Sequence, residues 1–211
     1  MRSLAKEKEL FETTPIMRAI AELAFPSIMG QIILVIYNMA DTFFVGLTRS
    51  DEMITAVTVC MPAFMFLSAI SNLFGVGGAS VISRFLGVHN KKDAGRASAF
   101  AIWGCVAVSA LYALGAWIFM DGFVNLLGGG NNELVHREAC RYMLIAVVIG
   151  GTVTSLNTLF SHLVRAEGRS LQASIGIMLG GVLNMALDPL FMFVILPKGN
   201  EVVGAALATM L

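Results

Sequence analysis

Long apolar segments, separated by short connections that carry most of the charge, constrain this chain more than any other feature. Five long segments cover about residues 19–45, 56–86, 97–120, 142–164 and 171–196, and a sixth covers 202–211. A helix needs about 20 apolar residues to cross the hydrocarbon core of a bilayer. Only 13% of the residues are charged, about half the share found in soluble domains. The sequence therefore predicts an all-α polytopic membrane protein.

The distribution of lysine and arginine predicts the orientation of the chain, because short cytoplasmic connections carry an excess of these residues. One side would hold Arg2, Lys6, Lys8, Arg18, Arg84, Lys91, Lys92, Arg96, Arg165 and Arg169, and the other only Arg49, Arg137, Arg141 and Lys198. We therefore expect residues 1–18 to form a cytoplasmic tail and residues 19–211 a transmembrane lobe. The sixth span would be only about half the usual length, so we expect the natural protein to continue.

Two aspartates interrupt the apolar segments. On the fifth span, Asn184 and Asp188 are four residues apart and therefore share a helix face. Pro189 follows directly and leaves the carbonyl of Met185 without its helical hydrogen bond. On the first span, Asp41 belongs to a polar stripe with Ser27, Gln31, Asn38 and Thr42. The fourth span carries a similar stripe of Thr154, Asn157 or Thr158, and Ser161.

Lipid cannot satisfy these polar stripes, so we expect them to face one another or a water-filled cavity. Asp41 and Asp188 would lie at similar depths in the outer half of the membrane, with no lysine or arginine deep in any span. The pair therefore predicts a site that takes up and releases protons, or holds a cation. Two plainer interpretations stay open: Asp41 as an interfacial residue, and Asp188 as a structural residue bonded to a neighbouring helix.

The remaining motifs give no sign of chemistry. Cys60, Cys105 and Cys140 have no metal-type spacing, so we expect small buried apolar residues and no metal site. The glycine-rich segment 126–132 is predicted to be an outer turn, because no strand or suitable lysine makes it a phosphate loop. The sequence shows neither a nucleophile placed beside a base nor an acidic cluster at a membrane face. It therefore gives no indication of an enzyme.

Several stretches, taken together, resemble a known family. They are AFPSIMGQIILVIYNMADTFFVG (24–46), GVGGASVISRFLG (75–87), RAEGR (165–169), LGGVLNMALDPLF (179–191) and GAALAT (204–209). In this order they are similar to the first half of the multidrug and toxic compound extrusion transporters, closest to bacterial members of the branch with proton-coupled transporters. The resemblance covers nearly the whole chain.

The resemblance implies a twelve-helix, two-lobe transporter, of which this chain would be the N-lobe with a truncated sixth helix and without the second lobe. Such proteins export organic cations and other amphipathic compounds in exchange for protons or sodium, and need no further cofactor. The implied coupling residues are Asp41, Asn184 and Asp188. The implied supporting residues are Tyr37, Asn157 and Thr209, with Pro26 as the helix bend.

The expected partners are therefore small organic cations, the lipid bilayer and the missing lobe, with no nucleic acid. The expected location is the cell (inner or plasma) membrane. Two other functions stay open. A lipid-linked oligosaccharide flippase would share the architecture, although we would expect it to have a more basic cavity. A non-transporting membrane scaffold would leave the two deep aspartates unexplained.

Overall fold

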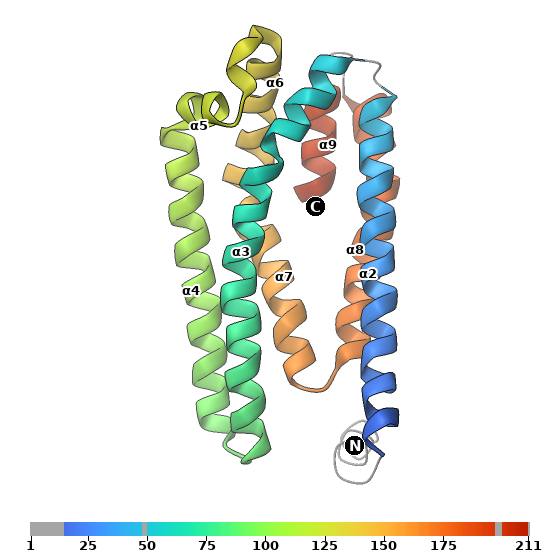
Figure 1. Ribbon diagram of the computed structural model, residues 1–211, viewed down its shortest axis with the longest axis vertical. Helices are drawn as coiled ribbons and strands as arrows, with labels where there is room; N and C mark the ends of the chain where they lie inside the picture. The colour runs from blue at the N-terminus through green and yellow to red at the C-terminus, as the bar shows by residue number, and fades with distance from the viewer. Residues whose placement is uncertain (1–14, 48–49, 197–199, 211) are drawn as a thin grey trace.

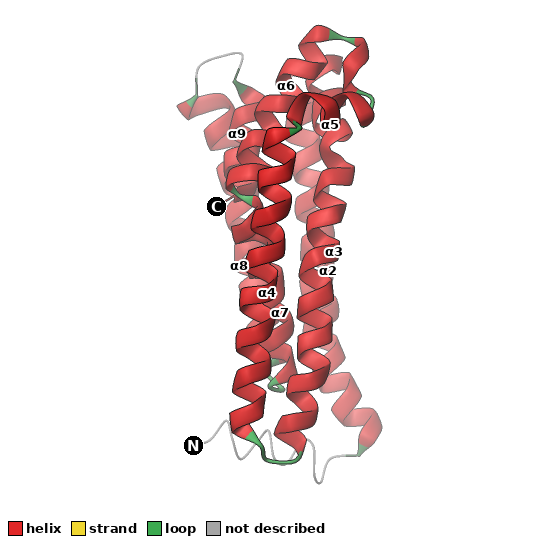
Figure 2. Ribbon diagram, turned by 90° about the vertical axis from the view of Figure 1, so that its left-hand side faces the viewer, coloured by secondary structure: helices red, strands yellow, loops and turns green. Residues whose placement is uncertain are grey.

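The computed structural model describes residues 15–47, 50–196 and 200–210, without the side chains of Ala19, Leu23, Asn38, Asp41 and Asn131 (Figure 1). Within these ranges every regular element is a helix and there is no strand, which confirms the all-α prediction. The long helices run lengthwise through the bundle, with α5 and α6 gathered at one end (Figure 2).

The helices occur in the following order. They are α2 (Ile16–Gly46), α3 (Asp51–Gly87), α4 (Lys91–Ile118), α5 (Met120–Leu126), the 3-10 turn η1 (Gly129–Asn131), α6 (Glu133–Met143), the π-helix η2 (Leu144–Ile149), α7 (Gly151–Ala166), α8 (Ser170–Pro189), the π-helix η3 (Leu190–Ile195) and α9 (Glu201–Met210).

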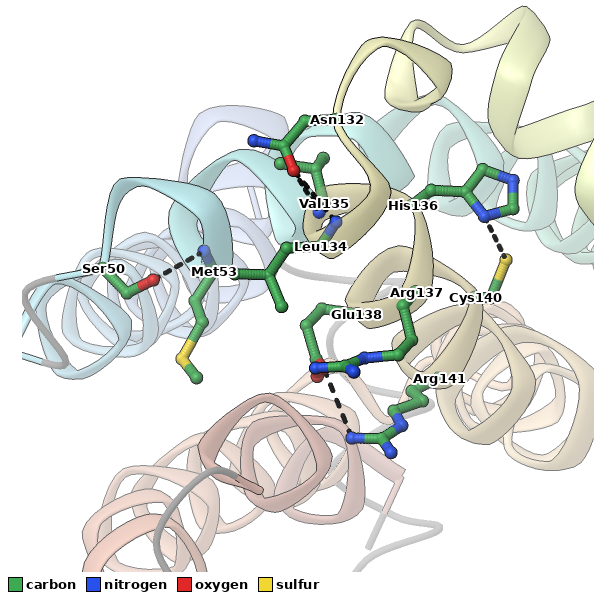
Figure 3. Close-up of polar contacts among 10 residues, drawn as sticks. All are labelled: Ser50, Met53, Asn132, Leu134, Val135, His136, Arg137, Glu138, Cys140 and Arg141. Atoms are coloured by element: carbon green, nitrogen blue, oxygen red, sulfur yellow. Dashed lines mark hydrogen bonds and ion pairs between the residues drawn. The ribbon is translucent and has the colours of Figure 1, made fainter.

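Polar side chains begin several of these helices. The Ser50 hydroxyl accepts a hydrogen bond from the backbone N–H of Met53 at the start of α3 (Figure 3). The Asn90 side chain does the same for Asp93 at the start of α4, and the Asn132 side chain accepts bonds from two N–H groups of α6. Such caps satisfy donors that the first helical turn leaves without partners.

Among the described residues, four straight segments are long and apolar enough to cross a membrane: α2, α3, α4 and the continuous run Ser170–Ile195 formed by α8 and η3. Their apolar side chains point largely outward. In the most apolar window of α2 only 6% of the residues are buried, and in that of α3 only 33%. A water-soluble bundle would bury one face of each helix, whereas this surface suits contact with lipid and with further membrane helices.

The fourth predicted span is bent rather than straight. The run Glu133–Ile149 meets α7 at an angle of 50°. At the break, the N–H of Gly150 donates to the carbonyl of Ile145 at 2.8 Å, the wider spacing of a π-helix, and such bulges are a recognised cause of kinks. No proline marks this position, so the sequence pattern gives no warning of the bend.

Small residues allow the helices to approach one another closely. A Cβ atom added to Gly78 on α3 would lie 2.9 Å from the Cβ of Ala101 on α4. One added to Gly151 on α7 would lie 2.9 Å from a methyl group of Leu67 on α3. Because lipid removes the usual hydrophobic drive for helix association, close packing at such positions stabilises membrane bundles.

Candidate functional site: the interface of α2 and α8

The fifth span positions the most deeply buried acid of the described residues. Asp188, in the last turn of α8, is 0% exposed, and Asn184 one turn earlier is 9% exposed. The side-chain oxygen of Asn184 is buried and has no hydrogen-bond partner within the described residues. An amide acceptor and a carboxylate therefore lie in the same buried region, one helical turn apart, as their sequence spacing predicts.

The helix that covers this face of α8 is α2. A Cβ on Gly30 would lie 3.5 Å from the Cβ of Ser174, and one on Gly181 would lie 3.2 Å from a methyl group of Ile33. The same Gly181 position is 3.7 Å from the Cβ and a ring carbon of Tyr37. The two helices thus touch over at least two turns, with glycine on each helix permitting the contact.

These contacts set a parallel register, and Figure 1 shows α2 and α8 running side by side in the same direction. Ser174, Gly181 and Asp188 are spaced by seven residues, so Asp188 continues the row of α8 that faces α2. On α2, position 41 comes one turn after Tyr37. The Gly30–Ser174 contact puts Asp188 level with position 44 of α2, and the contact of Gly181 with Ile33 and Tyr37 puts it level with about position 42. Asp41 and Asp188 would then be separated by at most about 5 Å along the helix axis.

The coupling role of Asp41 stays a prediction. Its backbone belongs to α2, but its side chain lies outside the described residues. Two members of the predicted stripe on α2, Ser27 and Gln31, line an open hollow of about 420 Å³ with apolar neighbours of the same helix.

The supporting residues lie in different settings. Tyr37 is half-buried against α8. Thr209 is half-buried on α9, where its hydroxyl donates to the carbonyl of Ala205 at 2.9 Å and keeps its lone pairs for a further partner. Asn157 is exposed on α7 rather than buried. Pro26 lies inside α2, which continues through it as one helix, so its proposed role as a bend also stays a prediction.

The segment after Asp188 is held by α9. A Cβ on Gly204 would lie only 2.8 Å from the Cα of Met192 and 2.9 Å from its nitrogen. The backbone of α9 therefore rests on the backbone of η3, which begins directly after Pro189. Only glycine permits such a close approach of two main chains.

Glu138, which lies just before the predicted fourth span, is a buried carboxylate that was not predicted from the sequence. Glu138 on α6 is 2% exposed, and its Oε1 accepts hydrogen bonds from Arg137 at 3.2 Å and Arg141 at 3.3 Å (Figure 3). In the sequence the two arginines serve only as orientation signals. A glutamate three residues before an arginine is a pattern that could have indicated this pair.

The cysteines only partly meet expectation. Cys60 and Cys105 are buried, as the apolar surroundings predict, but Cys140 is only half-buried. It lies on α6 at the end of the bundle, next to polar side chains, because α6 projects beyond the apolar part of the fourth span. The prediction of a small buried apolar residue is therefore wrong for Cys140.

The fold and its buried polar interface define a polytopic helical membrane protein. Residues 26–190 match the sequence profile of the MatE family, and the chain belongs to this family. It is 30% identical over 206 residues to the multidrug export protein MepA of Staphylococcus aureus (strain MRSA252), a match that covers 97% of this chain and 44% of MepA. MepA of Staphylococcus haemolyticus (strain JCSC1435) matches with the same identity and coverage.

Solved structures agree with this assignment. A crystal structure of MATE in the straight conformation has a TM-score of 0.86 at 28% identity, over 97% of this chain and 44% of that one. An outward-facing multidrug resistance MATE family transporter of the MOP superfamily has a TM-score of 0.81 at 28% identity, with the same coverage. The chain thus spans less than half the length of these relatives, which fits the N-terminal half predicted from its sequence.

Proposed function

We propose that this chain is the N-lobe of a secondary antiporter that exports cationic or amphipathic organic compounds in exchange for protons, or alternatively sodium. The observation that carries the proposal is the complete burial of Asp188 on the face of α8 that contacts α2. An ionisable residue placed deep in a membrane bundle is costly, and such residues mark ion pathways and proton relays. The relatives are named as export proteins, which supports a transporter rather than an enzyme.

The charges around this interface favour a cationic cargo. Neither residues 19–45 nor residues 170–196, which form the two facing spans, contain a lysine or arginine. A site of carboxylate and amide groups attracts organic cations and repels phosphate. A flippase for lipid-linked oligosaccharides would need basic groups to hold its diphosphate, so the α2–α8 interface argues against that alternative. A scaffold has no use for a carboxylate in this position.

The proposed cycle uses the charge of the carboxyl pair. In the outward-facing state a proton enters and neutralises Asp41 or Asp188, α2 bends near Pro26, and the cationic compound loses its electrostatic attraction and leaves. In the inward-facing state the proton departs and the restored negative charge recruits the next cation. Proton and cargo favour opposite charge states, so each lowers the affinity for the other by the same factor. The second lobe would complete the cargo pathway in the cell membrane, with the N-terminus in the cytoplasm.

Transport by the full-length protein in vesicles tests this proposal. A fluorescent organic cation and an imposed pH gradient would be used, with a sodium gradient as a second arm. Asp188→Asn and Asp41→Asn keep the side-chain size and remove the charge change, so gradient-driven transport should be lost while membrane insertion is retained. Asp51→Asn, the same exchange at an exposed helix start, is the matched control and should transport normally.

Normal gradient-driven transport by both Asp188→Asn and Asp41→Asn would refute the carboxyl mechanism. Loss of transport in the Asp51→Asn control would show that removal of any acid is harmful, and would also count against it. Transport driven by sodium alone would identify the coupling ion while leaving the role of the carboxyl pair in place.

A further inference from the structure

Three side chains that bind metals well converge at the end of the bundle formed by α5 and α6. Asp121 lies in the first turn of α5, and His136 and Cys140 lie one turn apart on α6. The Sγ atom of Cys140 is 3.8 Å from Nδ1 of His136 (Figure 3) and 3.9 Å from Oδ1 of Asp121. Taking one donor atom from each residue, all three lie within 4.8 Å of one another.

The chain reaches this arrangement by folding back on itself. After α4 ends at Ile118, the short helix α5 leads to Gly128, whose φ of +100° belongs to the left-handed region that glycine adopts without strain. The 3-10 turn η1 follows, and the Asn132 side chain caps the start of α6. Asp121 is thereby brought back against α6, although 15 residues separate it from His136 in sequence.

The contacts within this cluster are long for hydrogen bonds. A hydrogen bond between nitrogen and oxygen is about 2.7–3.2 Å long, whereas Nε2 of His136 lies 3.9 Å from Oδ1 of Asp121. The two contacts of Cys140 are long sulfur hydrogen bonds, at 3.8 Å to His136 and 3.9 Å to Asp121, so none of the three contacts is a strong direct bond. Around a tetrahedral ion with metal–donor bonds of about 2.0–2.3 Å, neighbouring donor atoms lie about 3.5 Å apart. Nδ1 of His136 faces Cys140 and Nε2 faces Asp121, so with either nitrogen as the ligand one pair of donor atoms starts up to 4.8 Å apart. Binding of a central ion therefore requires these exposed side chains to close by up to about 1 Å.

The donor set selects the kind of ion. Thiolate and imidazole are ligands for zinc and similar borderline metals, while calcium and magnesium prefer oxygen donors throughout. One thiolate and one carboxylate neutralise the two charges of Zn²⁺ when the imidazole is neutral. Histidine and cysteine at positions i and i+4 of a helix point to the same side, so both reach one ion without distortion of α6.

The surroundings leave access for an ion and for a fourth ligand. Asp121 is 87% exposed and His136 is 25% exposed, and the three residues line an open hollow of about 840 Å³. The nearby positive charges of Arg137 and Arg141 are engaged with Glu138, which reduces their repulsion of a cation. A site with three protein ligands and one solvent position is a common zinc arrangement.

We propose that Asp121, His136 and Cys140 bind a Zn²⁺ ion, with water as the fourth ligand, and that this ion ties α5 to α6. The site is separate from the α2–α8 interface and does not depend on the proposed transport. The cysteines have no metal-type spacing in the sequence, and for this reason the sequence predicts no metal site. The ligands come together only through the reversal of the chain between α5 and α6.

Zinc binding to the full-length protein in detergent tests the proposal, measured by competition with a chromophoric zinc chelator. We expect one ion per chain. Cys140→Ser and Asp121→Asn should each weaken binding at least tenfold, because each removes one of three protein ligands. Cys105→Ser, on a buried cysteine that packs with Ile82 and Leu163 rather than with α5 or α6, is the matched control and should bind like the unaltered protein.

Cobalt provides a second readout that needs no variant. Co²⁺ in place of Zn²⁺ should give a thiolate-to-metal charge-transfer band and the intense visible bands of tetrahedral coordination. The charge-transfer band should vanish in Cys140→Ser and persist in Cys105→Ser. Retention of one zinc ion at unchanged affinity in Cys140→Ser, absence of zinc binding by the folded unaltered protein, or a cobalt complex without the thiolate band would each overturn the proposal.

Discussion

Gly30 of α2 and Ser174 of α8 lie in backbone-level contact, with 3.5 Å between the Cβ of Ser174 and a Cβ placed on Gly30. This contact is one of those that set the register of the two parallel helices at the Asp188 site. Disulfides join residues whose Cβ atoms are about 3.5–4.5 Å apart. The double variant Gly30→Cys/Ser174→Cys, in a background with the native cysteines replaced by alanine, should therefore form a disulfide under mild oxidation.

The cross-link is read after cleavage at a protease site inserted in the connection between α3 and α4. The two fragments should stay together without reductant and separate with it. Gly30→Cys combined with Ile175→Cys is the matched control, because Ile175 is an exposed neighbour on another side of α8. Equal cross-linking of both pairs would show that α2 does not hold this register.

Gly180 and Gly181 are adjacent in sequence but differ in what a side chain would meet. A Cβ on Gly181 would lie 3.2 Å from Ile33, whereas one on Gly180 has nothing within 4 Å. Gly181→Leu should therefore force α2 away from α8 and lower the stability by about 1–3 kcal/mol. Gly180→Leu should leave it unchanged or raise it slightly, because glycine inside a helix is unfavourable. Thermal unfolding in detergent measures both. Equal losses in the two variants would contradict the described contact.

Arg137 and Arg141 both pair with Glu138, and either one should be able to compensate for the loss of the other. Arg137→Gln or Arg141→Gln alone leaves one ion pair with the buried carboxylate, so each should cost less than about 1 kcal/mol. The double variant leaves a buried charge without an arginine partner and should cost about 3 kcal/mol or more. Adding Glu138→Gln to the double variant should recover much of this loss, because it removes the charge itself. Additive effects of the single variants, measured in a double-mutant cycle, would refute this account.

The sequence predicts the helical membrane fold well because the bilayer imposes one simple requirement. A span must be long, apolar and hydrogen-bonded within itself, and these properties can be read directly from residues such as those of 19–45. The predicted spacing of Asn184 and Asp188 on one face agrees with their shared burial for a similar reason, since helical periodicity is local. The residue that lies opposite Asp188 cannot be predicted from periodicity alone, because it depends on how α2 packs against α8.

Features that depend on how the chain bends or folds back on itself could not be predicted from the sequence in this way. No proline marks the bend at Gly150, and the cluster of Asp121, His136 and Cys140 depends on the turn at Gly128. The polar stripe of α2 predicts a shared environment, and two of its members, Ser27 and Gln31, line an open hollow beside apolar residues of the same helix. Periodicity places residues on a helix face but does not say which neighbour covers it.

The close backbone packing of α9 on η3 has a mechanical consequence. With main chain resting on main chain at Gly204 and Met192, no flexible side chain can absorb a displacement between these two segments. Movement at the carboxyl end of α8, directly after Asp188 and Pro189, must therefore carry α9 with it. A change of charge in one buried turn would in this way be converted into the shift of a neighbouring helix.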